Sequence, residues 1–282
     1  MKFWQCGRRT WKRPSSESSI SWTFITDTWR REPVPIIDAL LDHLTDDAPV
    51  RRVLVGAFWT AVELDADPPR CGLASTLRGV GHHHGPPIAE AGRLLTYSGR
   101  ELAQWLRADR VMASSIGMAA YNALNGLNAV DEAACTEANA EDVILERGAG
   151  RRVAIVGHFP FVDRVRETAA ACWVLELVPR PGDLAAERAE EILPQADVVA
   201  LTGTSLLNHT FDELIGYCRP DAFILVLGPS TPFSPALFEA GVDGLSGTVV
   251  DDPARVLRAV EQGATFRQIK RAGGLRLLTL YK

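Results

Sequence analysis

Short apolar runs that each end in a glycine-bearing loop recur through the second half of this 282-residue chain. The runs at residues 153–156, 198–201 and 223–227 are β-branched or aliphatic, and each is about as long as one buried strand. Helical stretches separate them, and this alternation is typical of a parallel sheet. Because parallel strands end at one shared edge, we expect the loops to lie together where ligands bind in such sheets.

The three loops supply most of the candidate ligand-binding residues. They are rich in glycine, hydroxyl and amide groups, and comprise Gly157, Phe159 and Pro160 in the first loop, Thr202, Gly203, Thr204, Ser205 and Asn208 in the second, and Gly228, Pro229, Ser230 and Thr231 in the third. Such groups beside a helix start can bind a carboxylate, a phosphate or a metal-bound ligand. Helix capping and turn formation are the structural alternatives.

His158 in the first loop is the candidate catalytic residue. Imidazole changes charge near neutral pH, so it can act as a general acid or base where the loop faces a site. The alternative is a contact with backbone at the start of the next helix. No Gly-x-Ser-x-Gly elbow is present, which disfavours hydrolase chemistry.

A nucleotide-type cofactor has weaker support than a metal ion. Glu176 follows Gly157 by 19 residues, close to the position where an acidic residue binds a ribose hydroxyl in dinucleotide sites. However, neither Gly-x-Gly-x-x-Gly nor Gly-Lys-Ser/Thr occurs. The cofactor therefore stays unassigned.

Three consecutive histidines, His82 to His84, follow Cys71 by 11 residues. A strand would turn neighbouring side chains to opposite sides, although a loop could present two imidazoles to one ion. The glycines and prolines around the triplet offer nothing to orient the rings, so we expect solvent-facing histidines and no preformed site. Metal ligands are left unassigned.

Composition limits the partners to small molecules. The net charge of −5 and the pI near 5.7 argue against binding to nucleic acid or to an anionic membrane. Neither a spanning apolar window nor a secretory h-region is present, which predicts a cytoplasmic protein. Five dispersed cysteines without Cys-x-x-Cys fit reduced thiols. A homodimer is compatible with these features.

The chain divides into an extension and two expected domains. Residues 1–33 carry four tryptophans in a polar setting, residues 34–136 begin with a helical stripe, and residues 137–282 hold the strand–helix alternation. Ser98 and Glu101 predict a capping box, and Asp109 is expected to cap a helix over residues 110–124. The acidic, alanine-rich stretch at residues 131–140 suggests a boundary near residue 136.

Several motifs, taken in order, resemble an uncharacterised family described as putative heavy-metal chelation proteins. In the second half they are Val-Gly-His-Phe-Pro at 156–160, Glu176 with Pro-Gly-Asp ending at Asp183, and the loops at 202–210 and 228–232. In the first half they are residues 55–62, 71–74 and 115–123. The resemblance runs from about residue 36 to residue 263 and excludes the extension.

The resemblance implies an α/β chain in which an enolase-N-terminal-like α+β domain precedes a Rossmann-like domain with a mostly parallel sheet of about five strands. It also implies a site in the cleft between the domains, where a metal or a small metal-chelating or anionic metabolite would bind. Glu176 and Asp183 of these motifs join the candidate ligand-binding residues. An enzyme acting on a small anionic metabolite, with a nucleotide-type cofactor at the sheet edge, is the alternative. The family description defines no reaction, so enzymatic activity stays open.

Overall fold

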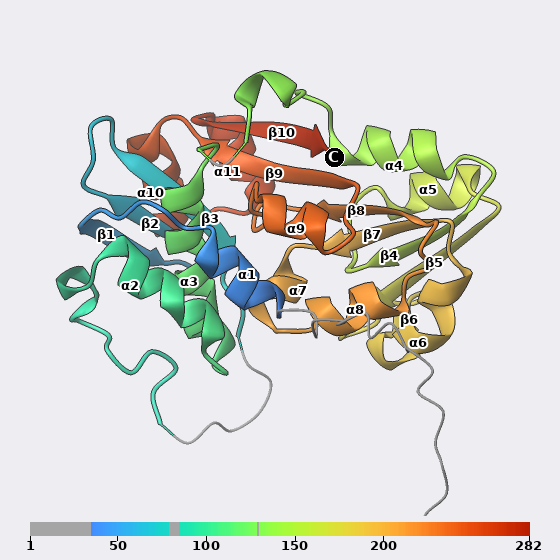
Figure 1. Ribbon diagram of the computed structural model, residues 1–282, viewed down its shortest axis with the longest axis horizontal. Helices are drawn as coiled ribbons and strands as arrows, with labels where there is room; N and C mark the ends of the chain where they lie inside the picture. Colours follow the sequence, from blue (N-terminus) through green and yellow to red (C-terminus); the bar gives the residue numbers. More distant parts are fainter. Residues whose placement is uncertain (1–34, 79–84, 129) are drawn as a thin grey trace, which may run out of the picture. The chain divides into compact units, whose positions relative to one another are not determined.

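Two sheets of different kind organise the computed structural model, which describes residues 35–78, 85–128 and 130–282 (Figure 1). Strands β1 to β3 form an antiparallel sheet, and the other seven strands form a sheet in the order β10-β9-β8-β7-β4-β5-β6. The strands are β1 Val50–Val55, β2 Trp59–Leu64, β3 Arg70–Ser75, β4 Arg152–Val156, β5 Ala171–Glu176, β6 Leu184–Ala185, β7 Val198–Thr202, β8 Phe223–Leu227, β9 Gly244–Val250 and β10 Leu275–Tyr281.

Short helices connect and cover these strands. The α-helices are α1 Ile36–Asp42, α2 Gly99–Ala103, α3 Val111–Asn125, α4 Ala140–Gly148, α5 Val162–Thr168, α6 Ala189–Ile192, α7 Thr204–Leu207, α8 Phe211–Tyr217, α9 Pro235–Glu239, α10 Pro253–Glu261 and α11 Phe266–Ala272. The 3₁₀ turns are η1 Leu94–Thr96, η2 Gln104–Arg107, η3 Glu132–Ala134, η4 Ala186–Arg188 and η5 Leu193–Gln195. Among the described helices, none is both long and apolar enough to cross a membrane.

The large sheet confirms the predicted α/β class with a mostly parallel sheet. All its pairings are parallel except that of β10 with β9, so two strands extend the expected five. Sequence patterning misses β6 because it has only two residues. Strand β5 ends at Glu176, and the next two residues, Leu177 and Val178, are 65% and 74% exposed.

Helices cover both faces of each sheet. Side chains of α4 and α5 pack on one face of the large sheet, while α6 to α9 pack on the other. In the small sheet α3 covers one face, and α10 and α11 cover the other.

The predicted capping box is confirmed, since the Ser98 Oγ accepts from the Glu101 backbone N–H at 3.2 Å. The Asp109 cap is wrong: Arg110, in extended backbone, precedes α3 without a side-chain cap.

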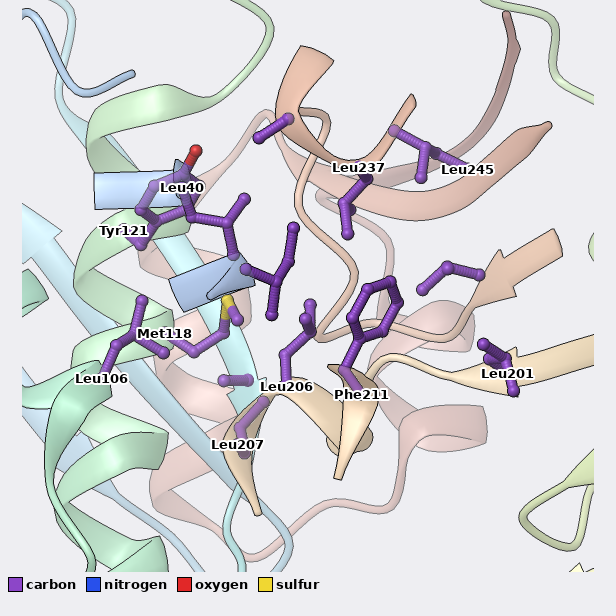
Figure 2. Packing of buried hydrophobic residues seen from close by; sticks show 14 of the residues in the cluster. Leu40, Leu106, Met118, Tyr121, Leu201, Leu206, Leu207, Phe211, Leu237 and Leu245 are labelled. Atoms are coloured by element: carbon purple, nitrogen blue, oxygen red, sulfur yellow. The ribbon is translucent and has the colours of Figure 1, made fainter. Parts of the chain in front are cut away.

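One apolar core joins the two sheets. Figure 2 shows Leu40 of α1 and Met118 and Tyr121 of α3 in the same buried cluster as Phe211 of α8 and Leu245 of β9. Such a shared core fixes the small sheet against the large one, because separating them would expose these side chains to water. Residues 34 to 282 accordingly form one compact unit. The boundary near residue 136 and the enolase-like and Rossmann-like labels remain predictions.

Candidate functional site

A cavity of about 550 Å³ lies at the carboxyl edge of the large sheet. Its walls come from the ends of β4, β5 and β7, from the η4–α6 segment, and from α7 and α8. Eight predicted site residues line it: Gly157, His158, Phe159, Glu176, Thr202, Thr204, Ser205 and Asn208. All lining residues fall between positions 156 and 217, so the cavity belongs to the large-sheet part of the chain and not to a cleft between the two sheets.

The third glycine loop lies elsewhere, and Gly228, Pro229, Ser230 and Thr231 do not line this cavity. The Ser230 Oγ accepts from the Ser75 backbone N–H at 2.9 Å, which ties the loop to β3. Ser230 and Thr231 are each only 1% exposed. The carboxyl edge is therefore divided, because the small sheet covers the end of β8. Pro160 and Gly203 also lie outside the cavity lining.

The first loop places His158 at the cavity wall. Gly157 adopts a φ of 98°, a left-handed conformation that favours glycine, and this bends the chain directly after β4. The His158 backbone N–H then donates to the Glu176 carboxylate at 2.9 Å. The His158 Nδ1 lies 2.8 Å from the Asp183 Oδ2, and its side chain is 18% exposed. Among the described residues the other ring nitrogen, Nε2, has no hydrogen-bond partner.

Asp183 lies behind His158 and not in the cavity lining where the sequence placed it. Its side chain is inaccessible to solvent, and its carboxylate also accepts from the Arg180 backbone N–H and the Arg166 guanidinium, both at 3.2 Å. Burial raises the pKa of Asp183, but the hydrogen bonds from His158, Arg180 and Arg166 and the charge of His158 together hold it below its ordinary value. A carboxylate only accepts, so Nδ1 donates to Asp183, and in the neutral ring Nε2 is the nitrogen that carries the lone pair.

Asp183→Asn is expected to destabilise the protein at neutral pH but not in acid. A carboxyl group whose folded-state pKa is depressed contributes stability above its unfolded-state pKa, and that contribution is lost as the pH falls through the folded-state pKa. The difference in unfolding free energy between wild type and variant should therefore shrink as the pH falls from neutral to below about pH 4. Urea unfolding across this range measures it; a difference that grows in acid would contradict the assignment.

Glu176 lines the cavity but holds two loops together. Its two carboxylate oxygens accept from the backbone N–H groups of His158 and Leu177, each at 2.9 Å. These bonds fix the bend after β4 against the end of β5. The role that the sequence suggested, binding of a ribose hydroxyl, would have to compete with both bonds.

The second loop uses most of its polar groups internally. The Thr202 and Thr204 hydroxyls lie 3.0 Å apart, and the Ser205 Oγ donates to the Thr202 carbonyl at 2.8 Å. With its amide turned to satisfy both ends, Asn208 donates to the Ser205 carbonyl at 3.0 Å. Hydrogen bonds within the loop therefore use more of its polar groups than its sequence indicates, although neither α7 nor α8 has a side-chain cap. His209, with a φ of 60°, then reaches the Leu106 carbonyl through Nε2 at 2.7 Å.

Glutamates from two helical segments complete the cavity, and the sequence analysis missed them. Glu187 and Glu190 come from the η4–α6 segment, and Glu213 comes from α8. The Glu213 Oε1 accepts from the Tyr217 hydroxyl at 2.7 Å, and this bond, with burial and the charges of Glu213 and Glu190, raises the pKa of Tyr217. Single glutamates on helices carry no distinctive motif; only the alternation of strands and helices could have pointed to them.

The side chains present do not fit a metal ion held by the protein alone. In the described part of the chain, no three His, Cys, Asp or Glu side chains converge as ligands. Cys71 is buried between β3 and α10, and burial raises the pKa of its thiol to about 12. His82 to His84 lie outside the described residues.

Two models of known families cover most of the described chain. One matches residues 139–279 and the other residues 37–125, and both carry the description putative heavy-metal chelation. The chain belongs to the putative heavy-metal chelation family. The match confirms the family resemblance that was inferred from the glycine-bearing loops and the other motifs. It names no reaction and no binding residue.

Two solved structures and one curated protein are similar to this chain. A protein with unknown function from Desulfitobacterium hafniense, of the same family, is 28% identical and covers 88% of this chain and 98% of its own, with a TM-score of 0.75. A second, from Pyrococcus horikoshii, is 19% identical and covers 88% of this chain and 98% of its own, with a TM-score of 0.71. At this identity it supports the fold alone. An uncharacterized protein from Methanocaldococcus jannaschii is 26% identical over 153 residues, which span 52% of this chain and 58% of that relative.

Proposed function

We propose that this protein binds a small metal complex in the cavity at the carboxyl edge, with the His158 Nε2 as the protein's own ligand to the metal. The Nδ1 contact with Asp183 carries the proposal. A carboxylate that accepts from one imidazole nitrogen orients the ring and makes the other nitrogen a stronger donor to metals. Asp183 is itself fixed by Arg166, so the ring has a defined orientation before any ligand arrives.

The cargo is proposed to be a complex, because the protein offers too few ligands for a bare ion. His158 is one donor, and no further set of side chains converges around it in the described residues. The cavity of about 550 Å³ has the size of a small-molecule site. Phe159, Leu175 and Leu214 add apolar surface to its wall, which suits the organic part of a chelator.

A second candidate is an enzyme in which the His158 Nε2 accepts a proton from the substrate. An imidazole oriented by a buried carboxylate is a common general base. The version with an anionic substrate and a nucleotide-type cofactor has less support. No Lys or Arg occurs among the described lining residues to bind a phosphate, and Glu176 already accepts two backbone bonds.

Calorimetric titration with two nickel complexes tests the proposal. Tris(2-aminoethyl)amine and nitrilotriacetate each occupy four positions on Ni²⁺ and leave two positions free for an imidazole. We expect one of the complexes to bind with a stoichiometry of one, and free Ni²⁺ to bind more weakly. If neither complex binds, or if binding is unchanged when His158 is replaced, the proposed function is wrong.

A further inference from the structure

We propose that the cavity selects cargo of net positive charge. The inference rests on the proposed function for the nature of the cargo and adds its charge class. Four glutamates line the cavity: Glu176, Glu187, Glu190 and Glu213. Among the described lining residues there is no Lys or Arg.

No basic side chain of the described residues offsets the negative charge of these carboxylates. None of the four forms an ion pair with Lys or Arg of the described chain. Arginine is available nearby, but it is used elsewhere. Arg188 pairs at 2.8 Å with Glu191, which does not line the cavity, and Arg166 pairs with Asp183 behind His158. The cavity wall therefore carries four carboxylates and, among its described lining residues, no basic side chain.

The four carboxylates come from three separate parts of the chain and line the same cavity. Glu176 is held at the end of β5 by two backbone N–H groups, and Glu213 is held on α8 by the Tyr217 hydroxyl. Glu187 and Glu190 lie on the exposed η4–α6 segment at the cavity wall. A ligand that coordinates the His158 Nε2 would thus be within the field of carboxylates from three separate elements. A cation gains from this field, and an anion is repelled by it.

The two nickel complexes provide a matched test, because they differ mainly in charge. The tris(2-aminoethyl)amine complex is a dication, and the nitrilotriacetate complex is a monoanion. We expect the dication to bind at least about tenfold more tightly, which corresponds to about 1.4 kcal/mol. Raising the salt concentration should reduce this preference, since exposed charges are screened. Equal binding of the two complexes, or tighter binding of the anion, overturns the inference.

Variants on the exposed helix identify the source of the preference. Replacing Glu187 and Glu190 together by glutamine should reduce the preference at least about threefold, because it removes two of the four cavity charges. Replacing the exposed Glu167 and Glu261 together by glutamine is the matched control: it also removes two charges, but from residues outside the cavity. Urea unfolding of each variant checks that the fold is kept. An equal effect of the control would show that net charge, and not the cavity, sets the preference.

A metal-free titration separates this inference from the proposed function. At neutral pH free tris(2-aminoethyl)amine is a polycation, whereas free nitrilotriacetate is an anion. Suppose that the free amine binds, that the double variant binds it more weakly, and that neither nickel complex binds. Charge selection then stands, and the proposed function fails. If a nickel complex binds through His158 without any preference for the cation, the proposed function stands and charge selection fails. Absence of binding by both complexes and by the free amine overturns both.

Discussion

His158→Asn is expected to weaken binding of the preferred nickel complex by about tenfold to a hundredfold or more while the protein stays folded. Loss of a group that only orients a metal ligand already costs about 10- to 100-fold in metal affinity, so loss of the ligand atom should cost at least as much. Asparagine is the sharpest replacement because its amide nitrogen occupies the position of Nδ1. It can still donate to Asp183, but it has no atom at the position of Nε2.

Two further variants separate binding from stability at the same position. His158→Ala should also destabilise the protein by about 1 to 3 kcal/mol, because it leaves the inaccessible Asp183 carboxylate without one of its donors. His158→Gln extends an amide toward the cavity but loses the donor to Asp183. Calorimetry gives the dissociation constants, and urea unfolding gives the free energies. Normal binding by His158→Asn together with an early unfolding transition would show that His158 is only a structural residue.

Gly72→Ala is expected to lower the free energy of unfolding by about 3 kcal/mol or more. A Cβ at this position of β3 would lie 2.1 Å from the Ala119 carbonyl oxygen and 2.3 Å from the Ala123 nitrogen, both in the backbone of α3. Overpacking typically costs about 1 to 3 kcal/mol, and here no flexible side chain can move aside. The helix would have to shift away from the sheet and disturb the core that joins the two sheets.

Gly216→Ala serves as the control for this substitution. Gly216 lies within α8, and a Cβ there would meet nothing within 4 Å. Because alanine favours helix more than glycine does, this variant should be more stable than wild type by about 0.5 to 1 kcal/mol. Urea unfolding of both variants measures the contrast. A loss of less than about 1 kcal/mol in Gly72→Ala would show that α3 can move away from β3 without cost.

Local patterns in the sequence were enough to place much of the large sheet. The apolar runs that became β4, β7 and β8 are each continuous over one strand, which is a signal carried by neighbouring residues alone. The capping box of α2 is local in the same way, since its two side chains are three residues apart. The meeting of the first two glycine loops at one edge also followed from the sequence, because parallel strands end on the same side.

The cavity's composition depended on contacts between residues far apart in the chain. Ser230 follows β8 with the same glycine and hydroxyl pattern as the other loops, but its contact with Ser75 of the small sheet removes it from the cavity. Asp183 is a candidate ligand-binding residue in the sequence, yet the Arg166 contact fixes it behind His158. Periodicity reports which face of an element is buried, and the sequence by itself therefore determined the elements and their common edge. Only the tertiary structure decided which loops the small sheet covers and which side chains face the ligand, because those depend on packing between distant segments.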